Sequence, residues 1–233
     1  MLEKYSAKDF KNSFPEWKRQ KDSFLVRHFF RPLSFYSAAI AANIGLSANQ
    51  VSLISLPMGI VSASLFVFPL KVCHILGAIV AWIWMLMDCT DGNLARTIKK
   101  EKYGEFIDAL SSYVFLPLLF LGIGMGAYYD GGLLPIAHNP LLILCGAYSG
   151  LFDVLPRLAY QKLRYTELTE KYEIVDSIQS ESKGYKRILR ELGLNGLFLP
   201  ALLLCSIIGT LDILVVFYFC IQTLLFIGSL AKM

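Results

Sequence analysis

Long apolar segments separated by short polar connections dominate the chain from residue 50 onward. Six of these segments approach the length needed to cross about 30 Å of hydrocarbon, at residues 50–70, 72–95, 105–128, 140–161, 192–210 and 212–231. Backbone N–H and C=O groups find no water inside a bilayer, so apolar runs of this length predict helices. The pattern therefore predicts an all-α integral membrane protein with six transmembrane helices.

Residues 1–46 follow a different pattern, in which lysines and arginines are mixed with large apolar side chains such as Phe10, Phe14, Trp17, Phe24 and Phe30. This mixture is typical of an amphipathic helix that lies in the membrane interface. We expect Arg31-Pro32 to break this helix, and Ser47 or Asn49 to cap the first spanning helix. The chain is thus divided into an interfacial segment, 1–46, and a transmembrane domain, 47–233.

Composition agrees with a membrane protein, because 55% of the residues are hydrophobic and only 17% are charged. The net charge of +4 is unevenly distributed, with basic residues gathered before the first span and again between Arg157 and Arg190. Basic patches that flank apolar spans favour anionic lipid headgroups over nucleic acid as partners. Five scattered cysteines argue against a disulfide framework and against a cysteine-ligated metal.

The distribution of lysine and arginine also predicts the orientation of the chain. With a cytoplasmic N-terminus, nearly all basic residues fall in inner segments and only Lys71 falls in an outer loop. We therefore expect a multi-pass protein of a bacterial inner or plasma membrane, with both termini in the cytoplasm.

Three carboxylates, two glycines and an arginine gather at the predicted cytoplasmic ends of the second and third spans. Asp88 and Asp91 are three residues apart and share a helix face, and Asp108 lies early in the next helix. Ionisable residues at the edge of a bilayer are destabilising, so such a cluster indicates a functional site. Carboxylate oxygens favour Mg²⁺ or Mn²⁺ together with substrate phosphates.

A simpler interpretation of this cluster is an ordinary surface network. In that case the three aspartates pair with Arg96, Lys99 and Lys100. Charge pairing alone does not require the glycines at positions 92 and 104.

These residues resemble the signature of the CDP-alcohol phosphotransferase (CDP-alcohol phosphatidyltransferase) family, D-x2-D-G-x2-A-R followed by G-x3-D-x3-D. The resemblance implies that two divalent cations, Mg²⁺ or Mn²⁺, bind Asp88, Asp91 and Asp108 and bridge the CDP diphosphate. It also implies that Asn49 and Ser52 line the nucleotide pocket and that Gly92, Ala95 and Gly104 leave room for the nucleotide. By the same resemblance, Arg96 contacts a phosphate or supports the carboxylates. A homodimer is a further implication of the resemblance.

Two departures from the signature stand out. The linker from Arg96 to Gly104 has seven residues instead of about eight, and the final aspartate is replaced by Ser112. In the family that aspartate completes the metal cage and is the proposed base for the acceptor hydroxyl. A serine hydroxyl is a weak neutral ligand and no base near neutral pH, so Ser112 is a candidate catalytic position of altered chemistry.

Three interpretations of Ser112 remain open. The enzyme works with three aspartates, because a general base contributes only about 10²–10⁴-fold. Alternatively another group, such as Glu105 or part of the acceptor, takes the proton. In the third interpretation the protein is catalytically impaired and binds a CDP-alcohol or a lipid as a sensor or scaffold.

The resemblance implies transfer of a phospho-alcohol group from a CDP-alcohol to an acceptor hydroxyl, with release of CMP, in the synthesis of phospholipids or related glycoconjugates. Asp108 and Arg96 are the other catalytic candidates. One of the two substrates is expected to be a lipid, because the site opens at bilayer depth. Asp153 and Arg157 lie four residues apart near the end of the fourth span, either as a mutual ion pair or as part of the acceptor pocket.

Overall fold

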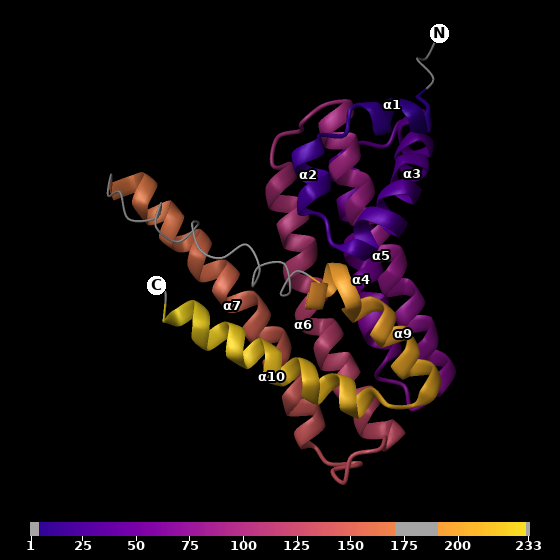
Figure 1. Ribbon diagram of the computed structural model, residues 1–233, viewed down its shortest axis with the longest axis vertical. Helices are drawn as coiled ribbons and strands as arrows, with labels where there is room; N and C mark the ends of the chain where they lie inside the picture. The colour runs from indigo at the N-terminus through magenta and orange to yellow at the C-terminus, as the bar shows by residue number, and fades with distance from the viewer. Residues whose placement is uncertain (1–4, 171–190, 232–233) are drawn as a thin grey trace.

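The computed structural model describes residues 5–170 and 191–231, which form helices joined by short connections (Figure 1). The long helices are α4 (Ala48–Leu65), α5 (Lys71–Thr97), α6 (Gly104–Asp130), α7 (Leu141–Glu170) and α10 (Leu211–Leu230). The shorter ones are α1 (Ala7–Asn12), α2 (Glu16–Lys21), α3 (Arg31–Asn43), α9 (Leu199–Ile208) and two π-helical turns, Val26–Phe30 and Leu194–Phe198. No strand occurs among the described residues, which confirms the all-α prediction.

Five helices in the described ranges are long and apolar enough to cross a membrane, namely α4, α5, α6, α7 and α10. They indicate a multi-pass membrane protein. The span expected at 192–210 is shorter than predicted, because the backbone of Gly196 is not helical and Gly209 ends α9 in the left-handed region. The apolar helix that includes α9, Gly196–Ile208, rises about 20 Å, which is less than the thickness of a hydrocarbon core. The count of six spans therefore remains a prediction.

Close backbone contacts fix α6 against α7. A Cβ at Gly124 of α6 would lie 2.7 Å from the carbonyl oxygen of Leu142, and a Cβ at Gly150 of α7 would meet the backbone of Pro117. Inside a membrane the hydrophobic effect does not drive helices together, so association depends on close packing, which small residues allow. The packing gives α6 a defined rotation about its axis, and with it the direction in which Asp108 points.

The N-terminal segment differs from the single amphipathic helix expected for residues 1–46. It is divided into α1, α2, a π-helical turn and α3, with interruptions near Pro15 and Ser23. The expected break at Arg31-Pro32 is wrong. The helical backbone continues from the π-helical turn Val26–Phe30 through Pro32 into α3.

These N-terminal helices pack on the C-terminal part of α5. Phe10 of α1, Phe35 of α3 and Leu94 of α5 are buried in one hydrophobic cluster. In Figure 1, α1, α2 and α3 surround the end of the bundle where α5 finishes and α6 begins. The carboxylate cluster predicted from the sequence lies at this end.

The start of α4 is also held at this end of the bundle. Ser47 forms a capping box with Gln50, in which the Ser47 hydroxyl accepts from the Gln50 N–H and the Gln50 side chain accepts from the Ser47 N–H. Such a cap satisfies two of the otherwise unpaired N–H groups of a helix start. Of the two predicted caps, Ser47 is confirmed, and Asn49 is left free for other contacts.

Candidate functional site

A cavity of about 360 Å³ opens where the start of α4, the end of α5 and the start of α6 meet. Its lining residues are Trp17, Ala48, Asn49, Ser52, Asp91, Gly92, Ala95, Arg96, Lys100, Glu101, Gly104, Glu105 and Asp108. Most of the residues selected from the sequence are therefore brought together. Three of them, Asp88, Ser112 and Arg157, do not line this cavity.

Ser52 and Asp91 join α4 to α5 at the base of the cavity. The Ser52 hydroxyl donates to Oδ2 of Asp91, and both residues are buried. A hydrogen bond to a carboxylate is stronger than one between neutral groups, and it restricts the orientation of the side chain. Ser52 thus restricts the orientation of the Asp91 carboxylate at the cavity.

Asn49 holds the loop between α5 and α6 against the start of α4. Its backbone N–H donates to Oε2 of Glu101 at 2.9 Å, and its side-chain Nδ2 donates to the carbonyl oxygen of Lys102 at 3.0 Å. Its Oδ1 is buried and has no hydrogen-bond partner in the described part of the chain. A Cβ at Gly104 would lie only 3.2 Å from this oxygen, so glycine keeps the space in front of it open. The cavity therefore offers an unused acceptor at Asn49.

Gly92 and Arg96 are one helical turn apart on α5. The guanidinium of Arg96 folds back over Gly92, where a Cβ would lie 2.9 Å from Nη2 of Arg96. The same Nη2 donates to Oδ1 of Asn93 at 3.1 Å. The space above Gly92, expected from the sequence to admit a nucleotide or a helix, is thus partly filled by Arg96. This arrangement gives a physical reason for the glycine four residues before the arginine.

Asp88, Asp91 and Asp108 lie close enough to repel one another electrostatically. Among residues 5–170 and 191–231, none of the three forms an ion pair with a lysine or arginine. Lys100 instead pairs with Glu105 at 2.6 Å, and Arg96 bonds to Asn93. The surface network considered from the sequence is therefore not formed.

Clustered carboxylates that form no direct ion pair have the chemistry that suits Mg²⁺ or Mn²⁺, although Arg31, Lys18 and Arg96 lie near enough to act on them electrostatically. Their oxygens are not gathered around a common point, however, and the described residues include no group of three His, Cys, Asp or Glu side chains arranged to hold a metal. The donor set fits a divalent cation, and the carboxylates of Asp88, Asp91 and Asp108 are the ones that would hold it. Reorientation of these side chains would accompany binding.

Ser112 lies one turn after Asp108 on α6. Its hydroxyl donates to the backbone carbonyl of Asp108 at 3.3 Å, and its side chain is half-buried. The neighbouring Ser111 is buried instead, where it is hydrogen-bonded to Ser55 of α4 and accepts from Nε1 of Trp84. The catalytic assignment of Ser112 stays a prediction.

Asp153 and Arg157 form the ion pair expected from their spacing, with Nη2 of Arg157 3.0 Å from Oδ2 of Asp153. Gln222 of α10 donates to the same carboxylate at 3.3 Å. These residues line a second cavity of about 190 Å³, together with Tyr218 and apolar side chains of α6. Arg157 therefore belongs to a cavity different from that of Arg96.

Four residues of the larger cavity were not identified from the sequence as lining it, namely Trp17, Ala48, Lys100 and Glu101. Trp17 comes from α2, and its side chain is 59% exposed. Sequence pattern marked it only as an aromatic of an interfacial helix. Trp17 is far from the signature along the chain, so nothing in the sequence indicated that it lines the same cavity as Asp91.

The comparisons with known proteins agree with the site. Residues 46–160 match the sequence model of the CDP-alcohol phosphatidyltransferase family. The matched range begins just before α4 and includes all the carboxylates of the cavity. A search of curated proteins found no match. Residues 46–160 are therefore a CDP-alcohol phosphatidyltransferase domain.

Proposed function

We propose that the protein transfers a phospho-alcohol group from a CDP-alcohol to the hydroxyl of an acceptor and releases CMP. The observation that carries this proposal is the 360 Å³ cavity, in which unpaired carboxylates and Arg96 face one another inside the family's matched region. A diphosphate bound through divalent cations needs acidic side chains, and its remaining charge suits an arginine. The acidic side chains and the arginine line the same cavity here.

The residues of the cavity have distinct roles in this proposal. Asp91, oriented by Ser52, and Asp108 line the cavity, and together with Asp88 outside its lining they would hold two divalent cations, Mg²⁺ or Mn²⁺. When bound, these ions offset the charge of the diphosphate and of the leaving CMP. Arg96 contacts a phosphate oxygen.

Asn49 completes the binding of the donor. Its unused Oδ1 accepts from the nucleoside, and Gly104 leaves the room for that contact. Ala95, which also lines the cavity, has a side chain small enough to let the nucleotide lie against α5.

In the transfer, the oxygen of the acceptor hydroxyl forms a bond to the phosphorus that bears the alcohol. The bond from that phosphorus to the oxygen of CMP breaks, and CMP keeps the electron pair. The hydroxyl proton passes to a carboxylate of the cavity. Asp108 and Glu105 both line it, and Glu105 already carries an ion pair with Lys100. Catalysis then rests mainly on positioning and electrostatics, as in other phosphoryl transfers.

The second cavity is proposed to receive a polar part of the acceptor. Charged side chains within a spanning helix are rare and usually functional. Arg157 keeps 45% of its side chain exposed although it is paired with Asp153, so its guanidinium remains accessible to a phosphate or a hydroxyl-rich headgroup. Since both cavities lie among apolar helices, we infer that the donor or the acceptor is a lipid.

The cellular setting is part of the same proposal. The distribution of lysine and arginine supports cytoplasmic termini, and a bacterial inner or plasma membrane is proposed with it. The larger cavity then opens to the cytoplasm, where nucleotide-activated substrates are found. Assembly into a homodimer is proposed from the family alone.

Turnover of radiolabelled donors by the purified protein tests the proposal. CDP-diacylglycerol, CDP-glycerol and CDP-choline are offered with Mg²⁺ or Mn²⁺, and CMP release is measured. We expect metal-dependent release that is lost in Asp91→Asn and kept in Asp9→Asn, a control at an exposed helix cap away from the cavity. Binding of a CDP-alcohol without CMP release from any donor would instead favour the sensor or scaffold.

A further inference from the structure

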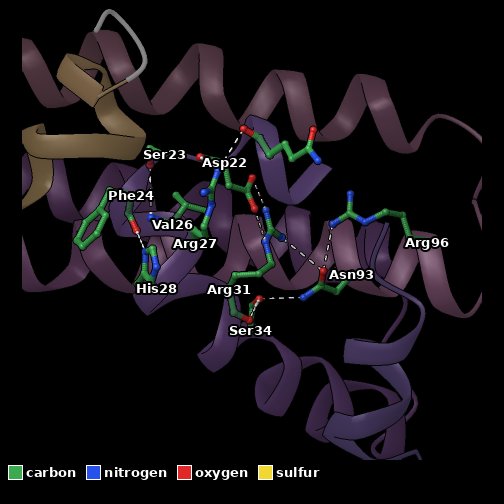
Figure 2. A network of polar contacts seen from close by, with 11 residues as sticks. Asp22, Ser23, Phe24, Val26, Arg27, His28, Arg31, Ser34, Asn93 and Arg96 are labelled. Carbon is green, nitrogen blue, oxygen red and sulfur yellow. Dashed lines mark hydrogen bonds and ion pairs between the residues drawn. The ribbon is translucent and has the colours of Figure 1, made fainter. Parts of the chain in front are cut away.

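A buried polar network joins the N-terminal segment to the signature on α5 (Figure 2). Asp22, in the connection after α2, binds Arg31 through two hydrogen bonds, from Nε at 2.9 Å and from Nη2 at 3.1 Å. Both side chains are buried. The remaining nitrogen, Nη1 of Arg31, donates to Oδ1 of Asn93 at 3.4 Å. The N-terminal segment therefore reaches a residue that lies three positions before Arg96.

The orientation of the Asn93 amide follows from its other partner. The Ser34 hydroxyl donates to the backbone carbonyl of Arg31 at 2.9 Å, so this hydroxyl can only accept from Asn93. Nδ2 of Asn93 is its donor, at 2.8 Å. Oδ1 of Asn93 must then point away from Ser34, toward the two guanidinium groups of Arg31 and Arg96.

The two arginines that share this amide oxygen differ in charge balance. Arg31 is neutralised by Asp22. Arg96 has no carboxylate partner within 5–170 or 191–231, and it lines the large cavity. Its guanidinium is held by a neutral amide oxygen and by the ring of Phe14, whose centroid lies 5.4 Å from it. Neutral contacts fix the position of a cation without cancelling its charge.

Phe14 strengthens the same link from the other side. Its ring faces Arg31 at 4.6 Å as well as Arg96. Attraction between a cation and an aromatic face is stronger where water is excluded. The ring and the amide together leave the long side chain of Arg96 few alternative positions.

We propose that Asn93 is a positioning residue, which, with Phe14 and the Asp22–Arg31 pair, holds the charged guanidinium of Arg96 at the cavity to bind a phosphate group of the donor. The proposal rests on the transferase function proposed above. It makes the N-terminal segment a part of the substrate site, although this segment lies outside the matched region 46–160.

A double-mutant cycle of Asn93→Leu and Arg96→Ala tests the proposal by kcat and KM for the donor. Leucine keeps the branching and the number of side-chain heavy atoms of asparagine but is bulkier and has no acceptor, so we expect kcat/KM to fall about 10- to 100-fold. Because Asn93 acts through Arg96, the same substitution in the Arg96→Ala background should change kcat/KM less than twofold. Additive losses would show independent roles and overturn the proposal.

The control is Ser37→Ala. Ser37 also links α3 to α5, through the hydroxyl of Thr90, but it does not contact Arg96. We expect its kcat/KM to stay within about twofold of the wild type. If Asn93→Leu does not fold in detergent, Phe14→Leu replaces it in the cycle, with an expected loss of about 3- to 10-fold.

A second measurement needs no turnover. Phenylglyoxal modifies accessible arginines, and peptide mass spectrometry gives the rate at Arg96. We expect faster modification in Asn93→Leu than in the wild type or in Ser37→Ala, and equal rates would overturn the proposal. If the wild type releases no CMP from any donor, the proposed function fails, and the modification rates alone decide the role of Asn93.

Discussion

The hydroxyl of Ser52 on α4 donates a hydrogen bond to the carboxylate of Asp91 on α5. Neither residue is exposed, and together they form the base of the larger cavity. The contact ties the first turns of α4, the first spanning helix, to the second aspartate of the signature on α5. It explains why a serine three residues after Asn49 accompanies that signature in this chain.

Ser52→Ala should lower kcat/KM for the donor about 10-fold, because the Asp91 carboxylate loses the hydrogen bond that fixes its orientation. Ser52→Thr keeps a hydroxyl and should restore most of the activity. CMP release at fixed Mg²⁺ measures both. Ser62→Ala is a matched control, since Ser62 is equally buried on α4 but binds the carbonyl oxygen of Gly77. Equal losses in Ser52→Ala and Ser62→Ala would argue for general destabilisation of α4.

Gly92→Ala should weaken donor binding, because the new Cβ would lie 2.9 Å from Nη2 of Arg96 and displace the guanidinium. We expect KM for the donor to rise about 10-fold while the protein still folds, since alanine is the better helix former. The change should have little effect once Arg96 is alanine. Gly228→Ala, where no atom lies within 4 Å, provides the control. An unchanged KM in Gly92→Ala would contradict this account of the glycine.

Ser112→Asp places a carboxylate one turn from Asp108 on the same helix. If Ser112 stands where a base has been lost, turnover at limiting Mg²⁺ should rise, by up to about 10²-fold if general-base catalysis is regained. Ser112→Asn serves as the uncharged control. Unchanged or lower activity would mean that the site is organised around serine, in keeping with its hydrogen bond to the Asp108 carbonyl.

Trp17→Ala should raise KM for every CDP donor about 10-fold, because stacking of a base on an aromatic ring contributes about 1–3 kcal/mol. Trp17 is the aromatic residue that lines the cavity, and its ring is largely exposed. Tyr36→Ala is the control, since Tyr36 is an exposed aromatic of α3 outside the cavity. If KM stays unchanged, Trp17 does not contact the nucleoside.

A chelator should abolish CMP release, and added Mg²⁺ or Mn²⁺ should restore it. Asp108→Asn should then need more cation for half-maximal turnover than the wild type, because one of three clustered charges is removed. Glu105→Gln tests proton transfer separately from metal binding. Glu105 lines the cavity as a candidate proton acceptor, but it is paired with Lys100 and is not one of the proposed metal ligands. Activity that survives complete removal of divalent cations would contradict the role proposed for the aspartates.

Sequence pattern predicted most of the long helices because their apolar runs are local and need no knowledge of the fold. It was less successful between 192 and 210, where the non-helical Gly196 shortens the helix. It also did not predict that the first 46 residues form several short helices. Apolar and basic residues are mixed in the breaks between these helices as well as within them. At the cavity, the helical period correctly brought Asp91, Gly92 and Arg96 onto one side of α5.

The sequence by itself determined the all-helical membrane character of the chain and the cluster of carboxylates, because hydropathy and helical spacing act over a few residues. Only the tertiary structure decided which distant groups complete the site. Trp17 reaches the cavity and Asn93 is shared by Arg31 and Arg96 because α2 and α3 pack on α5. Arg157 is kept in a separate cavity by the packing of α7 against α6 and α10. Such contacts depend on how helices lie against one another, and the spacing of residues along one helix does not specify that.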